Sequence, residues 1–293
     1  MDIVKRIDKI ANFSIERPFN FALHSSIGVG GNAPFACYPQ TVDDCCRLLD
    51  FLQSEEISFL TVGNMTNVLP MDTGTEKIVI STKKLVHAEI GKTVFVEAGV
   101  MSGRLLRACR CAGKSGVEFL NGIPCTLGGA LFMNAGVSGR YIAEIVDSVV
   151  VWMDGKKQTL TVDECRYAYK RSRFMDDGGV ILGAWLSLTD ATVKSIEETE
   201  RYYVEKRRHL PLGKSMGCVF KNPEGYVAGR LIEQAGLKGA RIGGAYVSEK
   251  HANFILNDGA ATSSDVCELI ACIKKEIEKQ FGIKLQEEIR YLT

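Results

Sequence analysis

One stretch of the chain, residues 217–256, concentrates the side chains best suited to catalysis. It places Cys218 directly after a glycine, continues with the turn Lys221-Asn222-Pro223 and adds a further cation at Arg230. A thiol ordinarily titrates near ~8.5, so it is mostly protonated at neutral pH and can donate a proton. We therefore expect a site that holds an anionic small molecule and transfers a proton, with a buried core thiol as the alternative for Cys218.

Two glycine-rich loops could cradle a phosphate-bearing ligand. The first loop, Gly63-Asn64-Met65-Thr66-Asn67, follows an apolar run, and the second loop, residues 122–136, reads GIPCTLGGALFMNAG. Glycine lets backbone N–H groups approach phosphate oxygens, and Thr and Asn side chains add donors. Either loop alone could be an ordinary turn, but two on one domain favour a large phosphate-bearing cofactor.

A third glycine cluster, Ile27-Gly28-Val29-Gly30-Gly31, is expected to act together with the first loop. It loosely resembles a dinucleotide-binding fingerprint. That match fails because no helix signal follows the last glycine, and Pro34 and Pro39 interrupt the segment.

The carboxylates Glu287 and Glu288 lie together near the C-terminus, in LQEEIRYL. On a strand the two side chains would point to opposite faces, so at most one would enter a site. Each alone is typical of a surface carboxylate. His24, His87 and His209 have no evident partner, and we expect His251 to be structural.

Composition excludes several functional classes. With 36 Lys+Arg against 35 Asp+Glu, no net field favours nucleic acid or a membrane surface. No run approaches the ~20 apolar residues that span a bilayer, and the charges in MDIVKRIDKI argue against a signal peptide. The ten cysteines form no CxxC pair, which argues against zinc and iron–sulfur sites and for a reducing cytoplasm. Three of them are expected to be small core residues of helices: Cys45, Cys267 and Cys272.

Strands and helices alternate along the chain, and at 293 residues it is long enough for more than one core. We expect a helix from Thr41, with Asp44 completing its cap, and another from Thr262, capped with Asp265. The apolar stripe of this last helix consists of Val266, Leu269, Ile270, Ile273 and Ile277. Further helices are expected at 101–112 and 193–208, strands at 59–62, 77–81, 93–98 and 284–291, and a hairpin at 149–160 around Asp154-Gly155.

Taken together, these segments resemble the UDP-N-acetylenolpyruvoylglucosamine reductase family, the MurB flavoproteins. The resemblance is collinear and runs from about Pro18 to Leu292. It is carried by SSIGVGGNAPFACYP, GNMTNVL, GIPCTLGGALFMNAG, GCVFKNPEGYVAGRLIEQAGLKG, RIGGAYVSEKHANFI and LQEEIRYL. Because the second domain contains no long insertion, the chain resembles the shorter of the family's two types.

The resemblance implies an α+β fold, with a two-lobed FAD-binding domain of the vanillyl-alcohol-oxidase (PCMH) type and a C-terminal α+β substrate-binding domain. We place an N-terminal helix at residues 1–20, the FAD-binding domain at 21–190 and the substrate-binding domain at 200–293. The implied cofactor is FAD, with NADPH as co-substrate and a nucleotide sugar as the small-molecule partner. We expect a cytoplasmic monomer with neither a nucleic-acid nor a membrane partner.

The resemblance also implies a reaction in peptidoglycan precursor synthesis. A hydride from NADPH passes through FAD to the vinyl carbon of an enolpyruvyl ether on UDP-N-acetylglucosamine, which gives UDP-N-acetylmuramate. The addition leaves negative charge beside the substrate carboxylate, so the reaction needs electrostatic stabilisation and a general acid. In the resemblance, Cys218 stands at the position of the family's proton-donating serine, and Glu288 matches the glutamate that stabilises the intermediate.

The binding residues follow from the same resemblance, and no metal ligand is expected. Those implied for FAD are Gly63, Asn64, Met65, Thr66, Asn67, Gly122, Ile123, Pro124, Thr126, Gly128, Gly129, Ala135 and Gly136. Those implied for the substrate are Tyr169, Lys221, Asn222 and Arg230.

The chain departs from the family pattern at several positions. The motif Tyr-Arg-x-Ser appears as Tyr169-Lys170-Arg171-Ser172, so Lys170 is the third expected catalytic residue and lacks the planar fork of arginine. Other departures are Met65 and Thr66 for Gly-Ser, Cys125 for glycine and Leu210 for glutamine. They keep open an alternative, a paralogue that binds flavin or a nucleotide sugar with little turnover. A flavin oxidase with another substrate is a third possibility, which the matching C-terminal segments disfavour.

Overall fold

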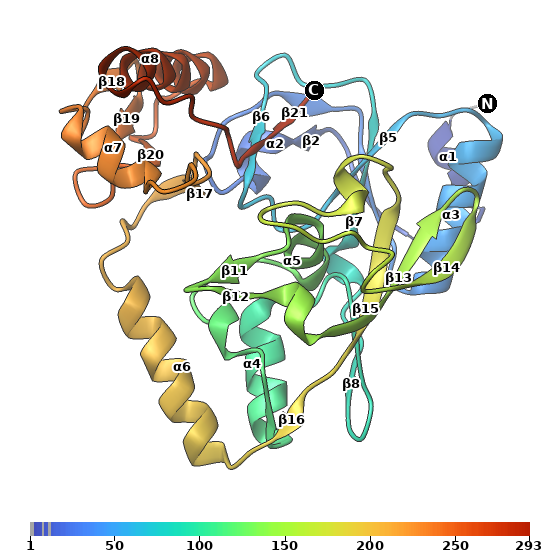
Figure 1. Ribbon diagram of the computed structural model, residues 1–293. Coiled ribbons are helices and arrows are strands. Elements are labelled where there is room, and N and C mark those ends of the chain that lie inside the picture. The colour runs from blue at the N-terminus through green and yellow to red at the C-terminus, as the bar shows by residue number, and fades with distance from the viewer. Residues whose placement is uncertain (1–2, 8, 11–12) are drawn as a thin grey trace. The chain divides into compact units, whose positions relative to one another are not determined.

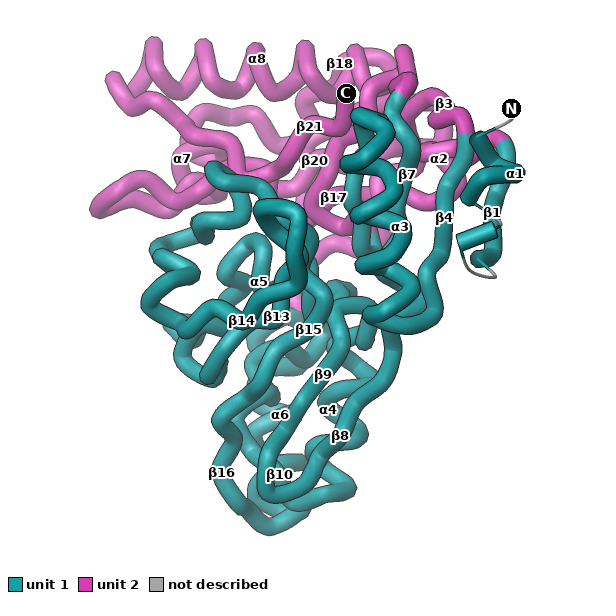
Figure 2. The backbone as a smooth tube through the Cα atoms, turned by 90° about the vertical axis from the view of Figure 1, so that its right-hand side faces the viewer, with its two compact units in different colours: residues 1–17, 35–64, 77–207 teal, residues 18–34, 65–76, 208–293 magenta. Residues whose placement is uncertain are grey.

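The computed structural model describes residues 3–7, 9–10 and 13–293, and the chain divides into two compact units. Unit 1 comprises residues 1–17, 35–64 and 77–207. Unit 2 comprises 18–34, 65–76 and 208–293 (Figure 2). The units therefore interleave along the sequence. The two units are defined by contacts within the chain alone. The predicted division into an FAD-binding domain and a substrate-binding domain stays a prediction.

The first lobe of unit 1 is built on a mixed sheet of four strands. Its elements are α1 (Ile3–Ile7), β1 (Ser14–Glu16), β4 (Ala36–Tyr38), α3 (Val42–Ser54), β5 (Phe59–Val62), β7 (Ile78–Ser81) and η1 (Thr82–Lys84). In the order β1-β4-β7-β5, the last three strands are parallel and β1 is antiparallel. Helix α3 begins as predicted, because Thr41 Oγ1 accepts a hydrogen bond from the Asp44 N–H at 3.1 Å.

The second lobe of unit 1 is built on an antiparallel sheet of five strands in the order β14-β13-β15-β9-β8 (Figure 1). Its strands are β8 (Ala88–Ile90), β9 (Val94–Glu97), β13 (Val146–Met153), β14 (Lys156–Thr161) and β15 (Val180–Leu186). The predicted hairpin between β13 and β14 is confirmed. Asp154 and Gly155 at its turn have φ of 53° and 72°, the double positive φ of a type I′ turn.

Helices and short elements surround this second sheet. They are α4 (Ser102–Cys111), β10 (Lys114–Ser115), η2 (Glu118–Leu120), α5 (Leu127–Met133), β11 (Gly136–Val137), β12 (Arg140–Tyr141), η3 (Ile142–Ile145), η4 (Arg173–Met175), β16 (Thr189–Asp190) and α6 (Val193–Arg207). Helix α5 packs on β9 and β15, and one apolar core joins α4, α5 and the sheet. This packing fixes α5, which lies within the second glycine loop (residues 122–136).

Unit 2 has its own apolar core. Its elements are β2 (Phe19–Asn20), α2 (Phe21–His24), β3 (Asn32–Ala33), β6 (Val68–Pro70), β17 (Lys214–Cys218), α7 (Ala228–Gln234), β18 (Arg241–Ile242), β19 (Ala245–Val247), β20 (Phe254–Asn257), α8 (Ser263–Phe281) and β21 (Arg290–Leu292). The main sheet is antiparallel, in the order β17-β20-β19-β18, and α8 packs against β18 and β19. The predicted capping box of Thr262 and Asp265 is confirmed, and the five predicted stripe residues are buried.

Distant segments are tied into unit 2 by hydrogen bonds at the start of α8. The Asp72 carboxylate accepts from the Ser263 N–H at 2.7 Å, and the Asp72 N–H donates to Ser263 Oγ at 2.9 Å. Strand β6 pairs in parallel with β21. Residues 65–76 therefore belong to unit 2, although residues 65–67 are part of the first glycine loop, whose Gly63 and Asn64 belong to unit 1.

Three local predictions are wrong in part. The described part of residues 1–20 is helical only in α1; β1 pairs with β4, and Pro18 disfavours helix at the preceding residue. The predicted strand at 284–291 pairs regularly only over β21, with one isolated bridge between Phe220 and Glu287. Cys45 is buried as predicted, but Cys272 is exposed because it lies on α8 away from the apolar stripe.

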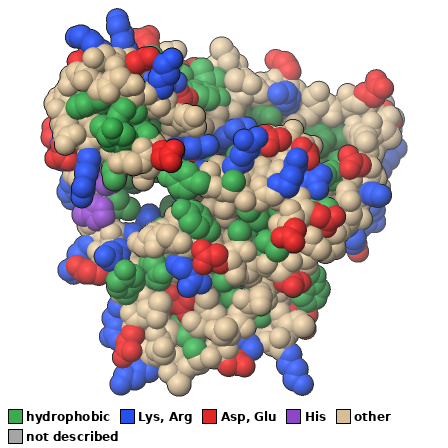
Figure 3. Space-filling view, viewed as in Figure 1, with side chains coloured by type: hydrophobic (Ala, Val, Ile, Leu, Met, Phe, Trp, Pro, Cys, Tyr) green, Lys and Arg blue, Asp and Glu red, His purple; other side chains and the backbone are tan. Residues whose placement is uncertain are grey.

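Surface charge follows the composition. Figure 3 shows acidic and basic side chains interspersed over the visible face, in keeping with the formal net charge of +1. Among the residues that the structure describes, no helix combines the length and apolarity needed to cross a bilayer.

Candidate functional site

The two glycine loops meet in unit 1. A Cβ on Gly63 would overlap Oγ1 of Thr126, so this close approach requires glycine. The side-chain amide of Asn64 donates a hydrogen bond to the Pro124 carbonyl oxygen at 2.8 Å. The structure thus brings together two segments that the sequence separates by some sixty residues.

The first loop offers backbone donors. Within the described chain, the N–H groups of Gly63, Asn64, Met65 and Thr66 donate no hydrogen bond to another part of the protein. Met65 has a φ of 49°, in the left-handed region, although its side chain is buried. A left-handed residue within a run of uncommitted N–H groups is the arrangement that forms an anion-binding nest. This loop therefore fits an anionic group such as a phosphate.

The second loop is mainly a packed support. At the start of α5, the N–H groups of Leu127 and Gly128 donate to Val100 and Ala98, and Gly129 donates to the Thr126 hydroxyl at 3.2 Å. Each of these N–H groups already has a hydrogen-bond acceptor within the protein, so none of them is available to bind an anion.

Further contacts hold the rest of the second loop in place. Ser102 binds the backbone of Ile123 and Cys125, and a Cβ on Gly122 would lie 3.1 Å from Nε of Arg207. Gly136 pairs with Tyr141 in the short hairpin β11–β12. Ala135 receives a hydrogen bond from Ile142 and donates one to Ala130.

Ser26, just before the third glycine cluster, connects this segment to the first loop and to β17. The expected joint role of the cluster and the first loop stays a prediction. The Ser26 hydroxyl lies 2.6 Å from the Ser215 carbonyl oxygen and 3.2 Å from that of Met65, and the Ser26 N–H also donates to Met65. The Asn257 amide donates to the Ile27 carbonyl oxygen at 2.9 Å. Sequence reasoning missed Ser26 because its partners are far away along the chain.

Cys218 lies immediately after a β-bulge. Between the pairs Ser215↔Leu256 and Cys218↔Phe254, β17 has one residue more than β20. Gly217 in the bulge has a φ of 77°, which only glycine adopts at little cost. Bulges redirect side chains and are frequent beside active sites. Cys218 is half-buried, while Val219 and Phe220 after it are buried, so the thiol is the accessible group of this segment.

A buried asparagine fixes the chain just after the thiol. The Asn253 side chain accepts from the Phe220 N–H at 2.9 Å and donates to the Phe220 carbonyl oxygen at 2.8 Å. Asn253 is 3% exposed, and its backbone carbonyl accepts from Val219. In the sequence, Asn253 is the amide side chain of the segment HANFIL, and the motifs assign it no separate role.

Glu288 lies beside this segment in unit 2. Its N–H donates to the Val219 carbonyl oxygen at 2.7 Å, and its own carbonyl oxygen accepts from the Asn67 side chain at 3.2 Å. The Asn67 carbonyl oxygen in turn accepts from the Arg290 N–H. Three predicted site residues, Asn67, Cys218 and Glu288, are thereby brought to one place.

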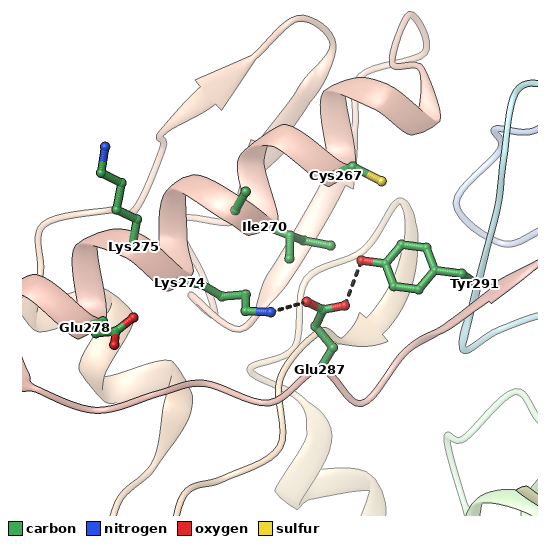
Figure 4. Close-up of a pocket in the computed structure, with 8 residues that line it drawn as sticks. Cys267, Ile270, Lys274, Lys275, Glu278, Glu287 and Tyr291 are labelled. Carbon is green, nitrogen blue, oxygen red and sulfur yellow. Dashed lines mark hydrogen bonds and ion pairs between the residues drawn. The ribbon is translucent and has the colours of Figure 1, made fainter. Parts of the chain in front are cut away.

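The neighbouring carboxylate, Glu287, is engaged elsewhere (Figure 4). It accepts from Lys274 Nζ and from the Tyr291 hydroxyl, each at 2.7 Å, in an open groove between α8 and the C-terminal segment. The expectation that at most one of the two glutamates is available is consistent with this arrangement. Glu288 is the candidate that remains.

The predicted substrate residues of unit 2 follow Cys218 in the chain. The Lys221 N–H donates to the Gln286 carbonyl oxygen, which continues the pairing of this segment with the one that carries Glu288. Asn222 Oδ1 accepts from the Ala228 N–H at the start of α7, at 3.0 Å, so part of its amide supports the helix. Arg230 lies exposed on α7.

The Tyr169-Lys170 dipeptide forms the tip of a tight turn in unit 1. Ala168 and Arg171 exchange two hydrogen bonds of 3.1 Å, and Lys170 between them has a φ of 53°. The Arg171 guanidinium forms an exposed ion pair with Asp176 at 3.0 Å. Of the two adjacent cations, Lys170 is therefore at the turn position and Arg171 is directed to Asp176.

Ionisation at the site is shaped by burial. Burial raises the pKa of the Cys125 thiol to about 11, and hydrogen bonds, among them one with Ser102, and the charge of Arg207 oppose that shift. All ten cysteines are free. Within residues 3–7, 9–10 and 13–293, no group of three or more His, Cys, Asp or Glu side chains could hold a metal ion.

Comparison with known proteins gives two family matches. Residues 33–161 match an FAD binding domain, and residues 208–292 match the C-terminal domain of UDP-N-acetylenolpyruvoylglucosamine reductase. The enzyme of that name from Carboxydothermus hydrogenoformans is 38% identical over 276 residues, 92% of this chain and 91% of the relative. That from Streptococcus pneumoniae is 37% identical over 284 residues, 95% and 94% of the two chains.

Solved structures agree with the sequence matches. The crystal structure of MurB from Thermus caldophilus has a TM-score of 0.84 at 31% identity, over 96% of this chain and 100% of that one. The glucose dehydrogenase Phl p 4.0202 has a TM-score of 0.51 at 12% identity, over 66% of this chain and 45% of that one. The second likeness shows a shared fold alone.

The fold and the paired glycine loops define a flavoprotein with a two-lobed FAD-binding domain of the PCMH type and a distinct C-terminal α+β domain. The C-terminal match decides which kind of flavoprotein this is. The chain belongs to the UDP-N-acetylenolpyruvoylglucosamine reductase (MurB) family, and its 293 residues fit the shorter type. The predicted fold class and the cofactors FAD and NADPH are thereby confirmed.

Proposed function

We propose that this protein reduces UDP-N-acetylglucosamine enolpyruvate to UDP-N-acetylmuramate, with NADPH as the reductant, and so serves peptidoglycan precursor synthesis. Relatives that carry this activity in their name align over nearly the whole chain. The observation in this structure that supports it best is the backbone hydrogen bond between Glu288 and Val219, the residue after Cys218.

Each proposed residue has a separate task. Bound FAD would supply the two-electron chemistry, carrying a hydride from NADPH to the vinyl group. The first loop would hold its phosphates through the N–H groups of residues 63–66, and Asn64 would keep that loop against Pro124. Tyr169, Lys221, Asn222 and Arg230 would bind the nucleotide sugar.

The chemical step requires a proton and a counter-charge. Hydride addition to the vinyl carbon leaves negative charge on the neighbouring carbon and its carboxylate. Cys218 would donate its thiol proton to that carbon, and Lys170 would stabilise the negative charge. Glu288, which belongs to the same unit as Cys218, would stabilise the intermediate. A thiol suits the donor role because it is more acidic than a hydroxyl by several pK units.

A second candidate is a paralogue that binds flavin or the nucleotide sugar with little turnover. The observation that favours it is Lys170 at the expected arginine position, with Arg171 paired to Asp176 and so not in its place. The test is NADPH oxidation by the purified yellow protein with and without the enolpyruvyl nucleotide sugar. Substrate-dependent oxidation supports the reductase. Bound flavin without turnover would support the paralogue, and a colourless protein that FAD cannot reconstitute would contradict both.

We further propose that the protein acts as a monomer in the cytoplasm. Ten free cysteines suit a reducing compartment. Light scattering at micromolar concentration should give the mass of one chain, and a stable dimer would contradict the first part of this proposal.

A further inference from the structure

Asn134 occupies an unusual position at the end of α5. It is 4% exposed and adopts the left-handed conformation, with φ 43° and ψ 58°, as the C-terminal cap of that helix. Asparagine tolerates this conformation better than most residues, but glycine is the usual choice. The side chain must therefore contribute something that a glycine would not.

The side-chain amide of Asn134 connects two other segments. Its nitrogen donates to the Ala168 carbonyl oxygen at 2.8 Å, and its oxygen accepts from the Ala143 N–H at 3.3 Å. Ala168 is the residue before Tyr169 and Lys170. The end of α5 is thus bonded to one side of the turn that carries both predicted site residues.

The other side of that turn is bonded to α5 as well. Ser172 is fully buried, and its hydroxyl donates to the Phe132 carbonyl oxygen at 2.6 Å. The turn is therefore held on both sides, at Ala168 and at Ser172, by the last residues of one short helix. Thr126 caps the start of the same helix, at the point where the second loop meets Gly63.

We propose that Asn134, with Ser172, is a positioning residue. Through α5 it fixes Lys170 relative to the place where the two glycine loops meet. The inference rests on the function proposed above and extends it to a residue with no direct part in the chemistry. It also accounts for the choice between the two cations: the bonds at Ala168 and Ser172 set the register of the turn, which keeps Lys170 at its tip and Arg171 toward Asp176.

The direct test uses two variants that keep the left-handed backbone. Asn134→Gly removes both side-chain bonds, whereas Asn134→Asp keeps an acceptor for Ala143 but loses the donor to Ala168. We expect both to lower the rate of flavin reoxidation by the enolpyruvyl nucleotide sugar by roughly 10- to 100-fold, since a small misplacement of a reacting group has effects of that size. Flavin reduction by NADPH should change less than about threefold, an effect far below that of lost positioning.

A second readout does not depend on turnover. Titration of the flavin-free protein with FAD should give dissociation constants within about threefold of wild type for both variants, because the first loop is untouched. A loss of FAD affinity of tenfold or more would overturn the proposal, since Asn134 would then act by holding the flavin loops.

A double-mutant cycle separates positioning from general destabilisation. In a Lys170→Ala background, the Asn134→Asp change should have almost no further effect on reoxidation, because the side chain it positions is gone. Additive losses in the double variant would overturn the inference. If the Asn134 variants fail to fold, Ser172→Ala offers the same test at the other side of the turn, with the same expected result.

The outcomes also distinguish this inference from the proposed function. If the wild-type protein does not pass electrons to the enolpyruvyl nucleotide sugar, the function is wrong. If the wild type does so and all three single variants match it, only the positioning role is wrong.

Discussion

The backbone N–H of Glu288 donates a 2.7 Å hydrogen bond to the carbonyl oxygen of Val219, the residue that follows Cys218. This bond joins two residues, 219 and 288, that are 69 positions apart in the chain. It means that the proposed proton donor and the proposed stabilising carboxylate are held by the same piece of backbone structure. The backbone segments that carry the two residues are thus held together within unit 2.

Replacement of Cys218 separates the two half-reactions. Cys218→Ala should leave flavin reduction by NADPH intact and lower reoxidation by the enolpyruvyl nucleotide sugar by about 100-fold or more, the usual scale for loss of a general acid. Cys218→Ser should retain measurable turnover because a hydroxyl can still donate. Stopped-flow absorbance of the flavin follows both steps. Normal turnover by Cys218→Ala would show that the proton comes from another group.

Glu288 and Glu287 form a matched pair. Glu288→Gln should lower the reoxidation rate by about 100-fold, because it removes the carboxyl group proposed to stabilise the intermediate. Glu287→Gln should leave that rate within about twofold. It weakens the contacts with Lys274 and Tyr291, and the ion pair with Lys274 is partly exposed and worth less than about 1 kcal/mol. Steady-state kcat and urea unfolding of both variants would check this. Equal losses of kcat would contradict the assignment of Glu288.

The two cations of the tight turn make a second pair. Lys170→Ala should reduce kcat by about 100-fold, and Lys170→Arg should raise kcat/KM by a few-fold, about threefold to tenfold, because a planar fork can bind a carboxylate with two hydrogen bonds. Arg171→Ala should change neither constant by more than about twofold, since its guanidinium serves Asp176 on the surface. If Arg171→Ala were the inactive variant, the cations would have been assigned the wrong way round.

Alkaline pH should destabilise the protein in part through Cys125. Burial raises the pKa of this thiol to about 11 in the folded protein, so the native state keeps a proton that the unfolded chain loses at lower pH. Stability is therefore complete below the ordinary thiol pKa and falls as pH rises toward about 11, by about 1.4 kcal/mol per pH unit from this group.

Cys125→Ser removes that contribution and provides its control. Buried Cys109 and Cys165 have raised pKa values as well, so the wild-type slope contains several thiols and the difference between the two proteins is the informative quantity. Urea unfolding at pH 8, 9 and 10 should show a shallower decline in the variant. Parallel declines would mean that Cys125 is not buried as a neutral thiol.

Local signals in the sequence predicted the elements well. Thr41 with Asp44 and Thr262 with Asp265 are capping pairs three residues apart, and Asp154-Gly155 specifies its own turn. In each case the partners lie within one turn of backbone, so the pattern contains the whole interaction. The family motifs likewise indicated Cys218 and Glu288, whose roles in the chemistry stay predictions.

What the sequence could not predict are polar contacts between distant segments. Ser26 reaches Met65 and Ser215, and Asn134 reaches Ala168, and no spacing rule connects such pairs. The segment LQEEIRYL predicts a strand, and Leu285 and Ile289 within it are buried. Before β21, however, its pairing is limited to the isolated bridge between Phe220 and Glu287 and the bonds beside it.

The run of uncommitted backbone N–H groups in the first loop has a consequence for the life of the protein in a cell. A ligand that binds the folded chain and not the unfolded one adds stability by mass action, about 2.7 kcal/mol at a hundredfold excess over its dissociation constant. FAD held at residues 63–66 would therefore act as a folding partner as well as a reagent. Newly made chains would compete for a limited supply of FAD. Chains without FAD would be less stable and would be degraded by proteases first.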